Sequence, residues 1–201
     1  MEVLDRYESL IDEWEAFASA IQRPLPSVAR VNTLKTTIDR AKTALDEEAI
    51  AYETTDWHDG LLRFSEETPG GNWPYVHGWL HGQEEVSALP PVVLDPQPGE
   101  RIWDATAAPG SKTTQIGALM EDTGLLVATD DNLGRLSALR SNAERLGLTN
   151  LAITNEDARH HSLKPFGGSQ YDRVLVDVPC SCEGTVRKHP TTLDTWTLDH
   201  V

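Results

Sequence analysis

Four aspartates lie at or just beyond the ends of short apolar runs: Asp104, Asp130, Asp157 and Asp177. If these runs form parallel strands, their carboxyl ends meet at one edge of the sheet, where open α/β sheets bind ligands. The small residues of 105–112 would let the backbone approach a ligand closely, and a following helix would offer its unpaired N–H groups. One aspartate alone reads more readily as a helix cap. The repetition favours a nucleoside cofactor site, with Asp130 accepting hydrogen bonds from ribose hydroxyls.

The loop after Asp104 narrows the class of cofactor. A dinucleotide fold would carry G-x-G-x-x-G here, and a P-loop would carry G-x-x-x-x-G-K-[ST]. The first pattern is absent. Lys112 follows Ser111, but Ala105 and Thr106 stand where the first glycine of a P-loop would be. S-adenosylmethionine has no phosphates to cradle, so a loop with one glycine and nearby acids suits it best.

Two cysteines, Cys180 and Cys182, lie one residue apart at the end of the last apolar run. This spacing suits a disulfide poorly, and two cysteines are too few for a disulfide framework. Reduced thiols are the simple interpretation. A metal half-site that also uses His189 is the alternative, but three ligands fall short of the four that structural zinc takes. We therefore expect no metal.

The elements that would position these residues alternate between strand and helix beyond Gly99. Apolar runs separated by helical segments predict βαβ units and a parallel sheet that is buried on both faces. The strands are expected at 101–106, 125–130, 150–154 and 172–178, and the helices at 112–120 and 133–146.

The first part of the chain shows a different pattern. Apolar residues at helical spacing predict an amphipathic helix from Val3 to Ile21. A small α+β unit follows, with a helix capped by Thr37. Its strands are expected at 27–36, 51–57 and 60–65. Proline and glycine clusters then punctuate the chain, and we place the boundary between a domain of residues 1–92 and one of residues 93–201.

The composition sets outer limits. The chain has 201 residues, and 39% of them are hydrophobic, which is enough for a packed core. No stretch approaches the roughly 20 apolar residues of a membrane span, and the acidic N-terminus is unlike a signal peptide, so we expect a cytoplasmic protein. The net charge of −15 disfavours loose nucleic-acid binding by the overall field. An acidic shell of this kind is typical of proteins from halophiles.

Several segments, in this order, resemble the Nop/Sun family of RNA cytosine-C5 methyltransferases, and especially its archaeal members. They are RVNTLK, GWLHGQEEVSALPPVVLDPQPGE, DATAAPGSKTTQ, ATDDNLGRLSALRSNAERLG, NEDA and YDRVLVDVPCSCEGTVRKHP. The resemblance covers residues from about 28 to 190. It implies an α/β fold, a Rossmann-like S-adenosylmethionine-dependent methyltransferase domain preceded by a small α+β RNA-binding domain.

The resemblance also implies a role for each matching residue. Asp130 would hold the ribose with Arg135 beside it, and Asp157 would lie near the adenine amine. Asp177 would lie beside the methionine part and the target base, and Cys180 would help to release the product. The cofactor loop would consist of Thr106, Ala107, Ala108, Pro109, Gly110, Ser111 and Lys112.

RNA contacts must be local in so acidic a chain. Arg30 and Lys35 flank the predicted strand of the small domain and are candidate contacts. Arg187 and Lys188 follow the Pro-Cys element and could meet phosphate near the target base; a solvated basic turn is the alternative. The RNA partner would be tRNA or rRNA.

The chain departs from the family pattern in three ways. Cys182 stands where the family usually has glycine, and Ser111 replaces the commoner second glycine of the cofactor loop. The family's attacking cysteine lies in a later Thr-Cys dipeptide, which this sequence lacks. We therefore expect a truncated form without the last strands, whose uncovered edge at 172–178 favours self-association. The alternative is a non-catalytic RNA- or S-adenosylmethionine-binding protein that keeps the first half of the fold.

The acidic shell generates a first prediction. At molar salt, charge repulsion is screened over about 3 Å, so the repulsion among surplus carboxylates should weaken. We expect the Tm to rise between low salt and molar potassium chloride, as followed by circular dichroism. A flat or falling Tm would count against a halophilic source.

Overall fold

The computed structural model describes residues 4–65, 70–162, 164–166, 170–194 and 196. The chain divides into two compact units, one of Ser27–Asp177 and one that joins Met1–Pro26 to Val178–Val201. Among the described residues, no helix has the length and apolar character to cross a membrane. The expected domain boundary after residue 92 stays a prediction.

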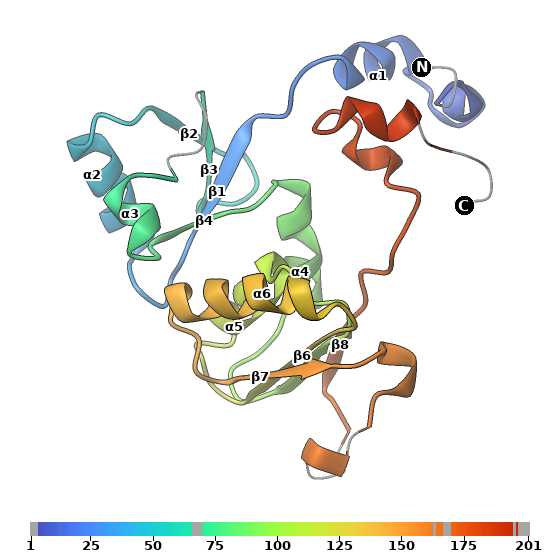
Figure 1. Cartoon of the computed structure of the whole chain (residues 1–201). Helices are drawn as coiled ribbons and strands as arrows, with labels where there is room; N and C mark the ends of the chain where they lie inside the picture. The colour runs from blue at the N-terminus through green and yellow to red at the C-terminus, as the bar shows by residue number, and fades with distance from the viewer. Residues whose placement is uncertain (1–3, 66–69, 163, 167–169, 195, 197–201) are drawn as a thin grey trace. The chain divides into compact units, whose positions relative to one another are not determined.

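The first sheet of the Ser27–Asp177 unit is small and antiparallel. Its strands are β1 (Ser27–Val31), β2 (Tyr52–Thr54), β3 (Leu61–Phe64) and β4 (Leu80–Gly82), in the order β2-β3-β1-β4. Helices α2 (Ile38–Glu47) and α3 (Trp73–Val76) accompany it (Figure 1). Thr37 caps α2 as the sequence predicts, because its side chain accepts a hydrogen bond from the Arg40 N–H. The core consists of Ala29, Val31, Ala41, Leu45, Leu62, Phe64 and Leu80.

The second sheet of this unit is parallel. Its strands are β5 (Arg101–Asp104), β6 (Leu125–Asp130), β7 (Leu151–Asn155) and β8 (Arg173–Leu175), in the order β7-β6-β5-β8. A 3₁₀ turn, η2 (Val86–Ala88), leads into α4 (Leu89–Leu94), which lies with α5 (Ser111–Leu119) and α6 (Leu133–Leu146) on one face of the sheet (Figure 1). The strand order reverses between β5 and β8, so the loops after these two strands meet at the topological switch point, where such sheets bind ligands.

Short helical turns complete the two units. In the Ser27–Asp177 unit, η3 (Ala158–His160) and η4 (Lys164–Phe166) lie between β7 and β8. The other unit contains η1 (Asp5–Leu10), α1 (Trp14–Ile21), η5 (Glu183–Thr185) and η6 (Pro190–Asp194).

Two elements differ from the sequence predictions. The prediction of a single helix from Val3 to Ile21 is wrong, because Ile11 takes extended dihedral angles and separates η1 from α1. Val3 itself lies outside the described residues. The strand expected over 172–178 is limited to β8. Among the described strands β8 is an edge, with no partner on its outer side, and Val176 and Val178 beyond it are exposed.

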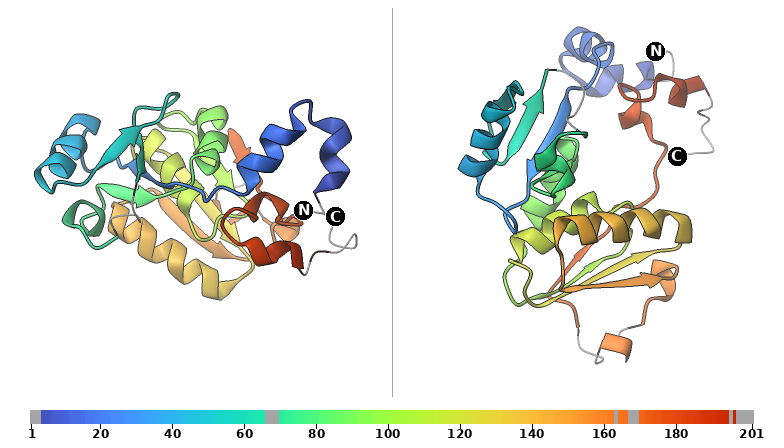
Figure 2. Two further views of the ribbon diagram at one scale, coloured as in Figure 1. Left: turned by 90° about the horizontal axis from the view of Figure 1, so that it is seen from above. Right: turned by 60° about the vertical axis from the view of Figure 1, so that its left-hand side comes forward.

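Polar contacts join the two sheets within the Ser27–Asp177 unit. The Asn32 amide donates to the carbonyls of Gly78 and Leu146, at 2.9 and 2.8 Å. The Arg145 guanidinium donates to the Leu80 carbonyl at 3.0 Å. Gly78 has a φ of +76°, and a Cβ there would lie 2.2 Å from the Arg145 carbonyl oxygen, so a larger residue does not fit. The antiparallel sheet is thus attached to the carboxyl end of α6, which the views of Figure 2 show over the parallel sheet.

Candidate functional site

The loop after β5 is tied to both neighbouring strands. The Ala105 N–H donates to the Leu175 carbonyl at 2.9 Å, and the Ala107 N–H donates to the Thr129 carbonyl at 2.8 Å. Gly110 ends the loop with a φ of +103°, and a Cβ there would lie 3.2 Å from the Leu139 side chain. Only glycine adopts this backbone easily. The loop therefore enters α5 with its backbone close against α6.

Asp130 connects this loop to α6. Its side chain is 5% exposed, and its carboxylate accepts hydrogen bonds from the N–H groups of Ala108, at 3.1 Å, and Asn132, at 3.0 Å. The Arg135 guanidinium lies 3.3 Å from the same carboxylate and donates to the Ala108 carbonyl. A carboxylate has about four acceptor positions, so capacity remains for a ligand hydroxyl.

Asp177 closes the opposite side of the switch point. Its N–H donates to the Thr106 hydroxyl at 2.8 Å, and its carboxylate pairs with Lys112 at 2.7 Å. More than half of its side chain is exposed. The end of β8, the loop after β5 and the start of α5 therefore meet at one point, and Asp177 keeps an open carboxylate there.

The other two aspartates are not equivalent to these. Asp104 is 1% exposed, and its carboxylate accepts a hydrogen bond from the Thr113 hydroxyl at 2.7 Å. Burial raises the pKa of Asp104 to about 6, so it supports the loop from inside. Asp157 caps η3, and hydrogen bonds from Arg159 hold the pKa of its carboxyl well below the usual range. It lies two residues beyond Asn155, the register partner of Asp130, and so near the same sheet edge.

The Pro-Cys element belongs to the other unit. Both Cys180 and Cys182 are free and exposed, and Cys182 has a φ of +60°. Partial desolvation of its thiol and the nearby Cys180 raise the pKa of Cys182. Glu183 accepts hydrogen bonds from Arg6 and from the Tyr7 hydroxyl, the latter at 2.5 Å. The N-terminal segment therefore packs against the loop that carries the two thiols.

The expected RNA contacts fall into different environments. Arg30 is 3% exposed and donates to Gln83 Oε1 at 2.9 Å and to the Thr114 hydroxyl at 3.2 Å. This position does not suit the RNA contact expected for Arg30, because its guanidinium lies between the two sheets. Lys35 is exposed, and its ammonium donates to the Arg145 and His77 carbonyls. Arg187 donates to the Arg23 and Pro24 carbonyls, and Lys188 is exposed beside it.

Sequence reasoning missed His81. Arg145 has only donors, so the His81 Nδ1 that lies 2.9 Å from its guanidinium is an acceptor. The ring proton is then on Nε2, which donates to the Ser111 hydroxyl at 3.2 Å. Burial, with Arg30 and Arg145 nearby, lowers the pKa of His81 to about 3. A neutral histidine of the small sheet thus holds the first residue of α5. The sequence offered one sign of this contact, because Arg30 and His81 are polar residues within strands whose other residues are mostly apolar.

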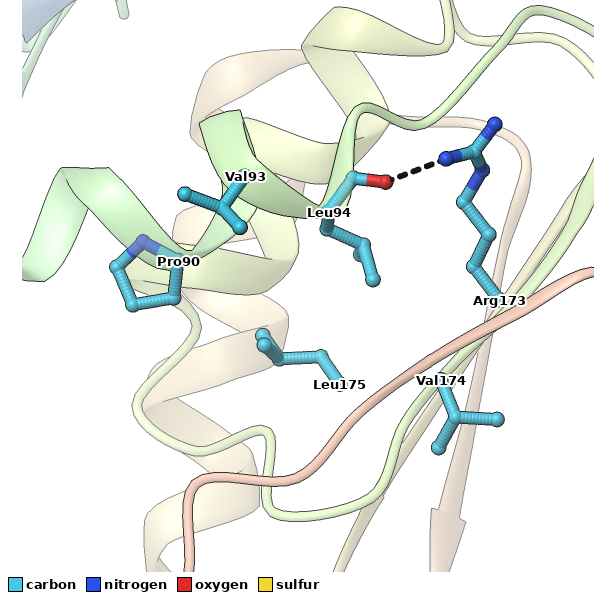
Figure 3. Close-up of a pocket in the computed structure, with 6 residues that line it drawn as sticks. All are labelled: Pro90, Val93, Leu94, Arg173, Val174 and Leu175. Atoms are coloured by element: carbon cyan, nitrogen blue, oxygen red, sulfur yellow. Dashed lines mark hydrogen bonds between the residues drawn. The ribbon is translucent and has the colours of Figure 1, made fainter.

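A separate pocket lies beside the β8 edge. It has a volume of about 480 Å³ and is lined by Pro90, Val93, Leu94, Arg173, Val174 and Leu175 (Figure 3). The polar group of Arg173 is turned to the Leu94 carbonyl, to which it donates at 2.7 Å. The lining contains no acid, so this pocket does not have the chemistry of a ribose or adenine site.

Comparison with known proteins decides the family. The model of the family described as 16S rRNA methyltransferase RsmB/F matches residues 91–195. This chain belongs to that family. A second model, the ferredoxin-like domain of RsmF/B-like methyltransferases, matches residues 5–69. The resemblance to Nop/Sun enzymes and the predicted fold class are confirmed.

Individual relatives agree. Ribosomal RNA small subunit methyltransferase F of Shewanella amazonensis is 38% identical over 89% of this chain and 39% of its own length. The tRNA (cytosine(49)-C(5))-methyltransferase of Pyrococcus abyssi is 36% identical over 99% of this chain and 63% of its own. A crystal structure of a methyltransferase homolog from Pyrococcus horikoshii has a TM-score of 0.78 at 31% identity, covering 90% of this chain and 57% of that one. The chain thus spans about two fifths to three fifths of these relatives.

The buried carboxyl of Asp104 should make the stability of this protein depend on pH. Because the pKa of Asp104 rises to about 6 on folding, its contribution to stability is complete below about pH 4 and is lost as pH rises through 6. Asp104→Asn stays neutral at every pH. We expect the free energy of unfolding of the wild type, relative to Asp104→Asn, to fall by about 2 kcal/mol between pH 4 and 7 in urea titrations. Parallel pH curves for the two proteins would contradict this.

Proposed function

We propose that this chain is the first part of a cytoplasmic, S-adenosylmethionine-dependent methyltransferase that acts on cytosine C5 of tRNA or rRNA. The observation that carries the proposal is the switch point, where the β5 loop, Asp130 and Asp177 meet in a member of an RNA methyltransferase family. The relatives named as methyltransferases are longer than this chain, which covers 39% of one and 63% of another.

The residues at the switch point fit S-adenosylmethionine. Asp130 has acceptor capacity for ribose hydroxyls, and Asp157 at the neighbouring strand end suits the adenine amine. The loop from Thr106 to Lys112 and the first N–H groups of α5 would hold the methionine part, with Asp177 beside it. When bound, the cofactor supplies an electrophilic methyl group. No phosphate-binding loop competes with this interpretation, because residues 105–112 lack the P-loop glycine.

The remaining chemistry falls to thiols and bases. Cytosine C5 is a poor nucleophile, so a thiolate must add at C6 before methyl transfer, and a base must then remove the C5 proton to expel that thiolate. We assign Cys180 to assisting this elimination. The attacking thiol would come from the Thr-Cys dipeptide of the family, which the 201 residues do not include.

Local cations would contact the RNA. Lys35 and Lys188, which are exposed, and Arg187, which is half-buried, stay in the proposal as RNA contacts. Arg30 does not, because it is buried. Self-association through the β8 edge remains part of the proposal. A non-catalytic S-adenosylmethionine- or RNA-binding protein is the second candidate, because the cofactor residues on the strands all precede Val178.

The cofactor assignment is tested at Asp130. Replacing Asp130 by Asn removes an anionic acceptor for the ribose, and we expect S-adenosylmethionine binding to weaken by about 1–3 kcal/mol in calorimetry. Asp131→Asn is the matched control, since Asp131 is the adjacent, exposed acid. Equal Kd values for the wild type and Asp130→Asn would reject the assignment.

The catalytic assignment is tested at Cys180, in a protein that also carries the Thr-Cys cysteine. Cys180→Ala should let the first thiol add but slow its departure, so a protein–RNA adduct should accumulate on denaturing gels. Cys182→Ala, two residues away, should accumulate none. Loss of all adducts in Cys180→Ala would make Cys180 the attacking thiol. Absence of tritiated methyl transfer by the wild-type protein to every unmodified transcript would favour the non-catalytic candidate.

A further inference from the structure

Two tryptophans and a histidine gather at α3 and in the segment that leads from it to β4. The Trp73 and Trp79 rings are 4.9 Å apart with an interplanar angle of 69°, and the His77 ring lies 6.2 Å from Trp73. Trp73 is 36% exposed, and His77 is exposed beside it. Part of the Trp73 side chain is therefore open to a ligand.

Two cations border these rings. The Arg40 guanidinium lies 5.2 Å from the centre of the Trp79 ring, within the range of a cation–π contact. The Lys35 ammonium donates to the His77 carbonyl at 3.2 Å. These side chains come from α2, α3 and the segments next to them. We call them the Trp73 cluster, which comprises Lys35, Arg40, Trp73, His77 and Trp79.

The charge of the Trp73 cluster is unusual for this chain. The chain has 32 acidic and 17 basic residues, and several guanidinium groups pair with acids, as in the pairs Arg63–Glu85 and Arg173–Glu100. In the part of the chain that the structure describes, Arg40 forms no ion pair and contacts an aromatic ring instead. A positive charge and a π surface are therefore presented together on a protein of net charge −15.

We propose that the Trp73 cluster stacks an unpaired base of the RNA substrate and holds the adjoining phosphate with Arg40 and Lys35. This inference rests on the proposed function and adds a place where the RNA is held. Aromatic side chains and arginine planes are the groups on which proteins stack unpaired RNA bases. Every base has a π face, so the cluster gives affinity with little sequence preference. Stacking acts at short range and does not require a basic protein.

Trp57 is a natural control. Trp57 is 41% exposed, about as much as Trp73, and it lies between β2 and β3 of the same small sheet. Its indole N–H, however, donates to the Glu85 carboxylate at 2.8 Å. That carboxylate is paired with Arg63 at 2.8 Å, so the exposure of the two rings is similar, but among the described residues Trp57 has no unpaired guanidinium over its ring to meet a phosphate.

The test measures binding of a single-stranded RNA of about 12 nucleotides to the 201-residue chain by fluorescence anisotropy. Trp73→Leu keeps an apolar contact with Trp79 but removes the ring, and we expect the Kd to rise by roughly 5- to 100-fold. Trp73→Phe should restore most of the affinity. Trp57→Leu should stay within about twofold of the wild type. Arg40→Gln should weaken binding and lower the slope of log Kd against log salt by about 0.7.

Several outcomes would overturn the proposal. Equal effects of Trp73→Leu and Trp57→Leu would remove the special role of the cluster, and so would an unchanged Kd in Trp73→Leu. If the wild type forms a dimer and Trp73→Leu is a monomer, the surface would be a contact between two copies of the protein. S-adenosylmethionine binding is measured on each variant, because Trp73→Leu should leave it unchanged if the protein is folded.

The failures of the two proposals can be told apart. If the wild-type chain binds RNA and the two leucine variants coincide, only the cluster proposal fails. If the wild-type chain binds no RNA, the RNA substrate and the cluster fail together, whereas the calorimetry of Asp130→Asn still decides the cofactor site.

Discussion

A buried guanidinium between the two sheets is the constraint on which the arrangement of the site depends. Arg30 of β1 has no carboxylate partner among its hydrogen bonds and is held by neutral groups, Gln83 directly after β4 and Thr114 of α5. Burial and the nearby Arg145 lower the pKa of Arg30 to about 10. A charge in such a place is costly unless its hydrogen bonds are well made, so β1, β4 and α5 have little freedom to shift relative to one another. The chain continues the same network through Gln83, which donates to Gln115 of α5 at 2.6 Å.

The cofactor loop inherits its position from this network. Its last residues lead directly into α5, whose first residue is held by His81. The C-terminal end of α6 is also held by the small sheet and its neighbouring loop, because Asn32 and Lys35 donate hydrogen bonds to the last carbonyls of this helix. The helix whose start pairs with Asp130 is therefore anchored by the small sheet at its end. The proposed RNA surface on the small sheet and the proposed cofactor site at the switch point are thus joined by hydrogen bonds through α5 and α6.

Sequence reasoning succeeded where local rules decide. The strands and helices between residues 101 and 155 follow from apolar runs and from Gly147, at which α6 ends, and Thr37 caps α2 for a local reason. It failed where a tertiary contact decides. Arg30 reads as a surface cation until its neighbours on β4 and α5 are known, and periodicity alone gives no sign of the break at Ile11. The ribose role of Asp130 followed from its place at a strand end, whereas the roles of Asp157, Asp177 and Cys180 came from the family resemblance. The structure adds that Asp104 is a buried support.

The acidity of the chain is compatible with the proposed RNA chemistry because an RNA contact can use single cations and aromatic rings rather than a basic surface. In this sequence the formal charge repels a polyanion at long range, and salt at the concentrations of a halophile would reduce both that repulsion and the gain from phosphate contacts. Short-range interactions lose little under these conditions, since stacking and buried hydrogen bonds do not depend on the ionic atmosphere. The proposed RNA surface, which joins tryptophan rings to the Arg40 guanidinium, would therefore lose less affinity in salt than a broad basic patch.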